Sequence, residues 1–132
     1  MTLKELSRLR WLSREIELDT ERLAKLEAKM APGGQAVDRI QACSGMSDKV
    51  GQLASEMGDL RDSIREKRQR CVMERNKLET YIADVDDSLT RLTMTMRYVD
   101  GLTWRMVARR LGGGNTADGC RKRCQRYVKS HE

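Results

Sequence analysis

Residues 100–129 read DGLTWRMVARRLGGGNTADGCRKRCQRYVK, and this pattern predicts two helices joined by a glycine-rich turn. Thr103 is a good N-cap for the first helix, because its hydroxyl can accept a hydrogen bond from a free amide of the first turn. Apolar residues then recur with helical spacing, at Trp104, Val107, Ala108 and Leu111. Gly112 follows, and glycine ends helices readily because it tolerates a left-handed backbone.

The second predicted helix, residues 116–129, has two chemically different faces. Asn115 is its expected N-cap, and Asp118 suits the positive end of the helix dipole. Its apolar residues repeat at helical spacing and are expected to face a core: Cys120, Cys124, Tyr127 and Val128. Most of its basic residues fall on the other side. A helix with an apolar back and a cationic front, held by a second helix across a short turn, fits the major groove of B-DNA.

The side chains expected to contact DNA lie on both helices and in the turn. Lys and Arg neutralise phosphates, Arg pairs bidentately with guanine, and Asn or Gln with adenine. The predicted DNA-binding residues are Thr103, Arg105, Arg109, Asn115, Thr116, Asp118, Arg121, Lys122, Gln125, Arg126 and Lys129. Because phosphate binding releases counterions, affinity is expected to fall steeply with salt.

Residues 89–129 resemble region 4 of sigma-70-type factors, the part that reads the −35 promoter element. The shared pattern is an R-Y-x-x-G-L-T sequence from Arg97, an aromatic residue, an A-x-x-L-G sequence from Ala108 and an R-K-R sequence at 121–123. The resemblance implies a helix-turn-helix DNA-binding domain over residues 86–132, with RNA polymerase as a candidate partner. With its helical N-terminal half, the whole chain resembles small phage or prophage proteins, including ArpU/RinA-like transcription regulators.

The turn departs from the sigma pattern. Gly113 stands where an apolar residue is usual, and Asp118 stands where a β-branched core residue is usual. The core position is therefore expected to pass to Cys120, and the turn is expected to be longer.

The positive charge is concentrated in the same region. The chain of 132 residues has a net charge of +6, and residues 101–132 alone carry eight Lys or Arg against two Asp or Glu. Charge gathered in this way is the electrostatic footprint of a nucleic-acid surface. The alternative is a solvated tail, which the apolar back of the second helix disfavours.

Two longer helices are predicted before residue 86. Residues 2–30 carry a heptad seam with Asp19 as its only polar member: Leu9, Leu12, Ile16, Asp19, Leu23, Leu26 and Met30. Four further apolar residues are expected to widen it: Leu3, Leu6, Trp11 and Leu18.

The next predicted helix has Ser47 or Asp48 as its expected N-cap. It carries a heptad seam that turns polar from Lys67 to Glu74: Val50, Leu53, Met57, Leu60, Ile64, Lys67, Cys71, Glu74, Leu78, Tyr81 and Val85. That polar stretch indicates weak packing, exposure to solvent or a device that sets the register.

The predicted fold class is all-α: a long antiparallel helical hairpin, coiled-coil-like, followed by the small helix-turn-helix domain. Residues 31–47 contain Pro32, Gly33 and Gly34 and are predicted to be a disordered or weakly ordered loop. Residues 1–85 would form the hairpin. A further helix is expected after the cap residues 86–88, with its inner face at Leu89, Leu92, Met96 and Val99.

A single hairpin has two layers and buries little surface, so we expect a homodimer that pairs two hairpins into four helices. Such a dimer would carry two DNA-reading heads, as a two-fold operator requires.

The sequence predicts a protein that is not an enzyme and has no cofactor. It contains no Ser/His/Asp set, and Gly112 to Gly114 lack the Lys and Ser/Thr of a phosphate-binding loop. Cys120, Cys124 and His131 lack the fourth ligand of a zinc site, so no metal is predicted. No apolar run approaches the ~20 residues that span a membrane, and the charged N-terminus is unlike a secretory signal. A cytoplasmic location without membrane contact is expected.

The leading functional prediction is a sequence-specific DNA-binding transcription regulator of phage or prophage type, which reads the major groove with helix 116–129. Two alternatives stay open. One is a phage DNA-packaging adaptor like a small terminase subunit, which would assemble as a ring. The other is a helical protein-interaction module without a DNA role, whose function would survive charge reversal at Arg121, Lys122 and Arg126.

Overall fold

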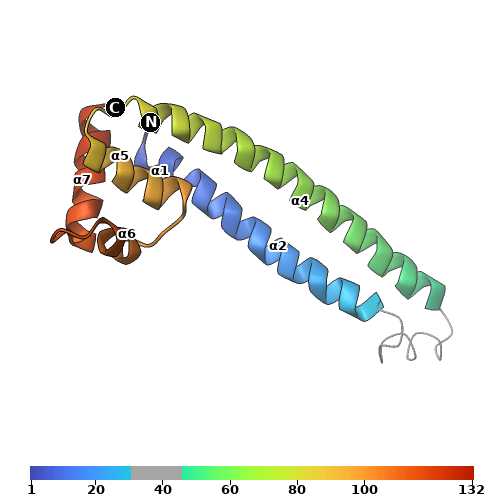
Figure 1. Cartoon of the computed structure of the whole chain (residues 1–132). Helices are drawn as coiled ribbons and strands as arrows, with labels where there is room; N and C mark the ends of the chain where they lie inside the picture. The colour runs from blue at the N-terminus through green and yellow to red at the C-terminus, as the bar shows by residue number, and fades with distance from the viewer. Residues whose placement is uncertain (31–45) are drawn as a thin grey trace. The chain divides into compact units, whose positions relative to one another are not determined.

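The computed structural model describes residues 1–30 and 46–132, and every regular element in these ranges is helical. The all-α fold predicted from the sequence is therefore confirmed (Figure 1). In chain order the elements are α1 (Leu3–Leu6), α2 (Arg8–Met30), α4 (Met46–Ala83), α5 (Ser88–Met94), the π-helical turn η1 (Thr95–Val99), α6 (Trp104–Leu111) and α7 (Ala117–Ser130). The loop predicted at residues 31–47 lies almost wholly outside the described residues. Because α4 already begins at Met46, neither Ser47 nor Asp48 is its N-cap.

The chain divides into two compact units. The first, here called the terminal unit, comprises Met1–Leu12 and Arg70–Glu132. The second, the paired-helix unit, comprises Ser13–Gln69.

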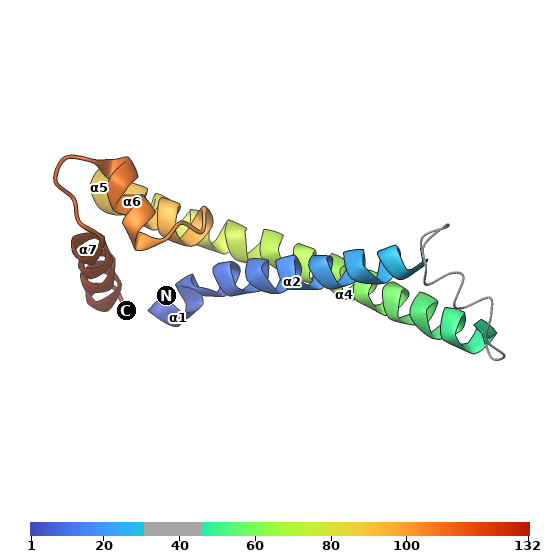
Figure 2. The same ribbon diagram turned by 90° about the horizontal axis from the view of Figure 1, so that it is seen from below.

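In the paired-helix unit, α2 and α4 run antiparallel beside each other, as Figures 1 and 2 both show. Met57 and Ile64 of the predicted seam are buried, and its other members in α4 are at least half-buried. The predicted seam of α2 is also turned away from solvent, and Asp19 is only 7% exposed. Its carboxylate receives a hydrogen bond of 2.6 Å from the Lys67 ammonium. The heptad pattern therefore predicted the contact face correctly.

The expected widening of the α2 seam is wrong for most of its members. Leu6 is fully buried, but Leu3 is 36% exposed, Leu18 is 45% exposed and Trp11 is 62% exposed. The predicted single helix over residues 2–30 is also interrupted at Ser7, which caps α1 while its hydroxyl donates to the Leu3 carbonyl at 2.9 Å. Back-bonding of this kind by Ser competes with the helical ladder and bends helices.

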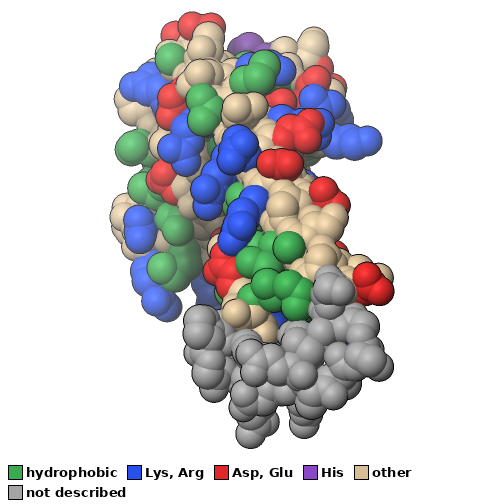
Figure 3. Space-filling view, turned by 90° about the vertical axis from the view of Figure 1, so that its right-hand side faces the viewer, with side chains coloured by type: hydrophobic (Ala, Val, Ile, Leu, Met, Phe, Trp, Pro, Cys, Tyr) green, Lys and Arg blue, Asp and Glu red, His purple; other side chains and the backbone are tan. Residues whose placement is uncertain are grey.

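On the face drawn in Figure 3, Lys and Arg lie among Asp and Glu rather than apart from them. This agrees with the near-zero net charge of residues 1–100.

The core of the terminal unit joins the two ends of the chain. One cluster of buried side chains draws on six helical elements and the segment after α4: Leu6, Leu9, Leu78, Ile82, Val85, Met94, Tyr98, Cys124 and Val128. Burial of this many large apolar side chains is the main stabilising contribution. The predicted C-terminal domain, residues 86–132, therefore shares its core with residues 1–12 and 70–85.

The helix after residue 86 begins as predicted, and its predicted inner face is partly right: Met96 and Val99 pack half-buried against the core, but Leu92 does not. Asp87 is the N-cap of α5, and its carboxylate accepts from the Thr90 amide at 3.0 Å. Thr90 and Thr93 are buried, whereas Leu92 is 51% exposed. The threonines tolerate burial because their hydroxyls are satisfied: Thr90 donates to Asp87 and Thr93 to the Leu89 carbonyl, each at 2.6 Å.

Candidate nucleic-acid interface

The first helix of the predicted motif is held by its cap and by its apolar face. Thr103 caps α6, accepting from the Met106 amide at 3.3 Å, as predicted. Val107 and Ala108 are buried against Cys120 of α7, with Trp104 and Leu111 packed around them. The α6 face predicted to be apolar is therefore the one that meets α7.

Tyr98 and Trp104 belong to this packing. Their rings meet edge to face at 6.1 Å, and the Arg97 guanidinium lies 4.7 Å from the centre of the Trp104 ring. Tyr98 is buried and Trp104 half-buried, as expected for core residues rather than base-stacking groups.

Three consecutive glycines form the turn between α6 and α7, drawn as an open loop in Figure 2. Gly112, Gly113 and Gly114 have φ angles of 63°, 60° and 79°. Residues with a side chain are strained in this left-handed region, so the longer turn depends on glycine.

The N-cap of α7 is Thr116 and not Asn115, which corrects the prediction. The Thr116 hydroxyl accepts from the Gly119 amide at 3.0 Å. Asn115 is engaged in the turn instead, because its side-chain amide donates to the Gly112 carbonyl at 2.7 Å. The three glycines bring that carbonyl within reach, and the capping position moves one residue along the chain.

The back of α7 is buried as predicted. Cys120, Cys124 and Val128 are 2%, 0% and 1% exposed. Burial raises the pKa of the Cys120 thiol, and it raises the pKa of the Cys124 thiol to about 12. Both thiols are therefore neutral at pH 7 and serve as small apolar core residues. Within residues 1–30 and 46–132, no three His, Cys, Asp or Glu side chains gather to hold a metal ion.

The front of α7 carries most of the predicted DNA-binding side chains. Lys122, Arg126 and Lys129 are exposed, and Arg121 and Gln125 are half-buried. With about 3.6 residues per turn, these positions lie on the side opposite Cys120 and Cys124 or on its flanks. The helix therefore presents cations to solvent along more than two turns.

At the start of this front, three of the predicted residues form one cluster. Asp118 accepts from Arg121 at 2.6 Å and lies 2.9 Å from the Lys122 ammonium. These contacts hold the pKa of Asp118 below its ordinary value, and the hydrogen bond from Arg121 contributes most to the lowering. Asp118 is therefore ionised at neutral pH.

The α6 arginines stand apart from this cluster. Arg105 and Arg109 are exposed and four residues apart, so they share one flank of the helix. Arg110 is exposed as well, a further cation absent from the sequence prediction. None of the three forms an ion pair with another described residue.

The sequence did not predict the contact between Arg123 of α7 and Asp87. Arg123 lies 3.6 Å from the Asp87 carboxylate and so links the flank of α7 to the start of α5. Hydrogen bonds from Thr90, with a smaller contribution from Arg123, keep the pKa of Asp87 low. No sequence pattern signals this pair, because its members lie on separate helices.

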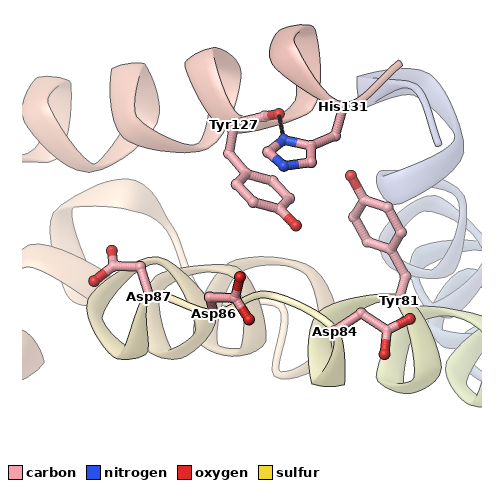
Figure 4. A pocket seen from close by; sticks show the side chains of 6 residues that line it. All are labelled: Tyr81, Asp84, Asp86, Asp87, Tyr127 and His131. Atoms are coloured by element: carbon pink, nitrogen blue, oxygen red, sulfur yellow. Dashed lines mark hydrogen bonds between the residues drawn. The ribbon is translucent and has the colours of Figure 1, made fainter.

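A pocket of about 590 Å³ lies in the terminal unit, lined by Tyr81, Asp84, Asp86, Asp87, Tyr127 and His131 (Figure 4). Sequence reasoning did not identify it. His131 stacks on Tyr127, with ring centres 4.0 Å apart, and Tyr81 meets Tyr127 edge to face at 6.3 Å. Its three carboxylates would repel phosphate, so we do not expect the pocket to contact DNA.

Comparison with protein-family models, with curated proteins and with solved structures found no match. No helix in the described part of the chain is long and apolar enough to cross a membrane.

Proposed function

We propose that this protein is a sequence-specific DNA-binding transcription regulator of phage or prophage type. Helix α7 enters the major groove, with α6 held behind it and the arginines of α6 on neighbouring phosphates. The resemblance of residues 89–129 to sigma region 4 supports RNA polymerase as a second partner.

The two-faced character of α7 carries the proposal. Cys120, Cys124 and Val128 anchor the helix in the core, so its orientation is fixed by packing. Its opposite side exposes Lys122, Arg126 and Lys129. A cationic tail without such an anchor would bind phosphate but could not hold base-reading side chains in register.

A homodimer through the long helices completes the proposal. Large apolar side chains stay exposed on helices of the terminal unit: Trp11 at 62%, Val72 at 61% and Met73 at 61%. Apolar surface of this kind is usual at protein–protein contacts. Two copies would present two α7 helices to a two-fold operator.

The test is selection of binding sites from random duplex DNA at about 150 mM salt, where non-specific phosphate binding is weak. The full-length wild type is run beside the double variant Arg121→Ala/Lys122→Ala. An enriched motif that the variant loses supports the proposal, and a two-fold motif supports the dimer.

The matched control is Arg68→Ala/Arg75→Ala, which removes the same charge from exposed positions of α4. This variant should retain the motif. Salt-sensitive retention of DNA without any motif would favour a packaging adaptor, and a ring-sized mass in sedimentation would strengthen that case. Absence of DNA binding at low salt would contradict the proposal and leave a protein-interaction module.

A further inference from the structure

Asp118 places a negative charge on the surface that is proposed to meet DNA. Its side chain is 57% exposed, and those of Arg121 and Lys122 are 43% and 53% exposed. The three groups therefore lie at the solvent-facing front of α7, where they add nothing to the buried core.

The geometry divides the carboxylate between two cations. Oδ1 accepts from an Arg121 terminal nitrogen at 2.6 Å, while Oδ2 lies 2.9 Å from the Lys122 ammonium. Asp118 thus engages two of the cations nearest the start of α7. A phosphate that approaches them must compete with a carboxylate that is already in place.

The same contact leaves part of Arg121 free. Only one of its terminal nitrogens bonds to Asp118, and guanidinium has five N–H donors in a planar fork. The remaining donors can pair with O6 and N7 of guanine, and a fixed guanidinium plane makes that pairing selective.

We propose that Asp118 is a positioning residue that determines DNA specificity: it orients Arg121 toward a guanine and restrains Arg121 and Lys122 from indiscriminate phosphate binding. This inference rests on the proposed DNA-reading function. It assigns Asp118 a role exerted through Arg121, rather than a base contact of its own.

A purely structural role makes a different prediction. An acidic residue in the first turn of a helix stabilises it through the helix dipole. Loss of that effect would lower the melting temperature but would not change the ratio of affinities for different DNA sequences.

The experiment compares wild type, Asp118→Asn and Asp118→Glu in the full-length chain. Affinity is measured by fluorescence anisotropy for the selected site and for a random-sequence duplex over a range of salt concentrations. Circular dichroism gives each melting temperature. Glu79→Gln, an exposed carboxylate on α4, is the charge-matched control.

Asp118→Asn is expected to bind random duplex several-fold more tightly, with a salt slope steeper by about one. Its preference for the selected site over random duplex should fall about tenfold, with guanine lost from one position of the motif. Asp118→Glu keeps the charge and should restore weak binding to random duplex. Glu79→Gln should change neither affinity by more than about twofold.

An unchanged preference in Asp118→Asn, with only a shifted melting temperature, would overturn the inference while the wild type still bound its site. Binding of neither duplex by the wild type would overturn the proposed function and the inference together.

Discussion

Lys67 of α4 and Asp19 of α2 form a hydrogen-bonded ion pair of 2.6 Å in the contact between the two helices. Asp19 is the one polar residue of the α2 seam, and Lys67 is the first polar residue of the α4 seam. Glu15 adds a second carboxylate at 3.7 Å from the Lys67 ammonium. A polar pair in such a seam favours one register, because a slip of either helix would leave a buried charge without its partner.

Removing one member of this pair should therefore cost more free energy of unfolding than removing one member of an exposed ion pair. Asp19→Ala is expected to lower the free energy of unfolding by about 1–2 kcal/mol, since Lys67 loses its main partner in a part-buried position. Urea unfolding followed by far-UV circular dichroism measures the change. The charge-swapped double variant Asp19→Lys/Lys67→Asp should recover part of the loss.

The matched control is the exposed pair Arg14–Glu17, which has a similar distance of 2.8 Å and side chains 55% and 63% exposed. Glu17→Ala should cost less than about 0.5 kcal/mol, because solvent screens such pairs. Equal losses in Asp19→Ala and Glu17→Ala would show that the buried pair has no special role in register.

Stability should also decline at alkaline pH. Burial raises the pKa of Tyr98 from 10.0 to about 12 and that of Cys124 from 9.0 to about 12. Above about pH 9 the unfolded state releases protons that the folded state retains. The contribution of these two groups to the free energy of unfolding is therefore complete below pH 9 and is lost as pH rises toward 12. The hydrogen bond from Lys67 to Asp19 raises the pKa of Lys67 and acts in the same direction.

Tyr98→Phe tests this linkage, because it keeps the ring and removes one titrating group. The loss of unfolding free energy between about pH 8 and about pH 11 should be smaller in this variant by on the order of 1 kcal/mol. Urea titrations at the two pH values give the difference. Identical losses in wild type and variant would exclude Tyr98 as a source of the alkaline sensitivity.

The heptad pattern predicted the long helices well because the burial of α2 and α4 follows a simple repeat. The inner face of α5 was predicted wrongly at Leu92, for a physical reason. Thr90 and Thr93 are buried because their hydroxyls find partners within the same helix, and Leu92 is left outside. Hydrophobicity along the chain does not reveal which polar groups will be satisfied locally. In the π-helical turn at Thr95–Val99 that follows, the prediction holds: Met96 and Val99 pack half-buried against the core, and Tyr98 is buried.

The sequence predicted which residues of the candidate interface are exposed or buried, but not which side chains bond to each other. The cations of α7 and its buried cysteines follow from helical spacing alone. The bond of Asn115 to the Gly112 carbonyl depends on three left-handed glycines, and the link from Arg123 to Asp87 depends on the packing of separate helices. Neither relation has a local sequence signature.

Tyr81, which lines the pocket in the terminal unit, carries a hydroxyl whose contribution to stability can be tested. Its hydroxyl is buried and has no hydrogen-bond partner among the described residues. Tyr81→Phe should therefore leave the free energy of unfolding unchanged or raise it by up to about 1 kcal/mol, since it removes an unpaired polar group and keeps the ring against Tyr127. Thermal and urea unfolding measure the change. A loss above about 1 kcal/mol would show that the hydroxyl contributes a stabilising contact.

Replacing Gly119 by alanine should not stabilise the chain, although the same substitution at other helical glycines should. A Cβ at Gly119 would lie 2.9 Å from the Thr116 hydroxyl oxygen, whereas a Cβ at Gly51 meets nothing within 4 Å. Gly51→Ala is expected to stabilise the chain by about 0.5–1 kcal/mol through helix propensity. In Gly119→Ala the same gain is offset, because the displaced Thr116 hydroxyl no longer caps α7, a contact worth about 1 kcal/mol.

A double-mutant cycle separates these two effects. In a Thr116→Ala background the cap is already absent, so adding Gly119→Ala should stabilise the chain as much as Gly51→Ala does in the wild type. Urea unfolding of the four variants gives the coupling between the two positions. Additive changes would mean that Gly119 is not needed for the cap; a coupling near 1 kcal/mol would mean that the start of the proposed recognition helix is set by a glycine that leaves room for its neighbour's hydroxyl.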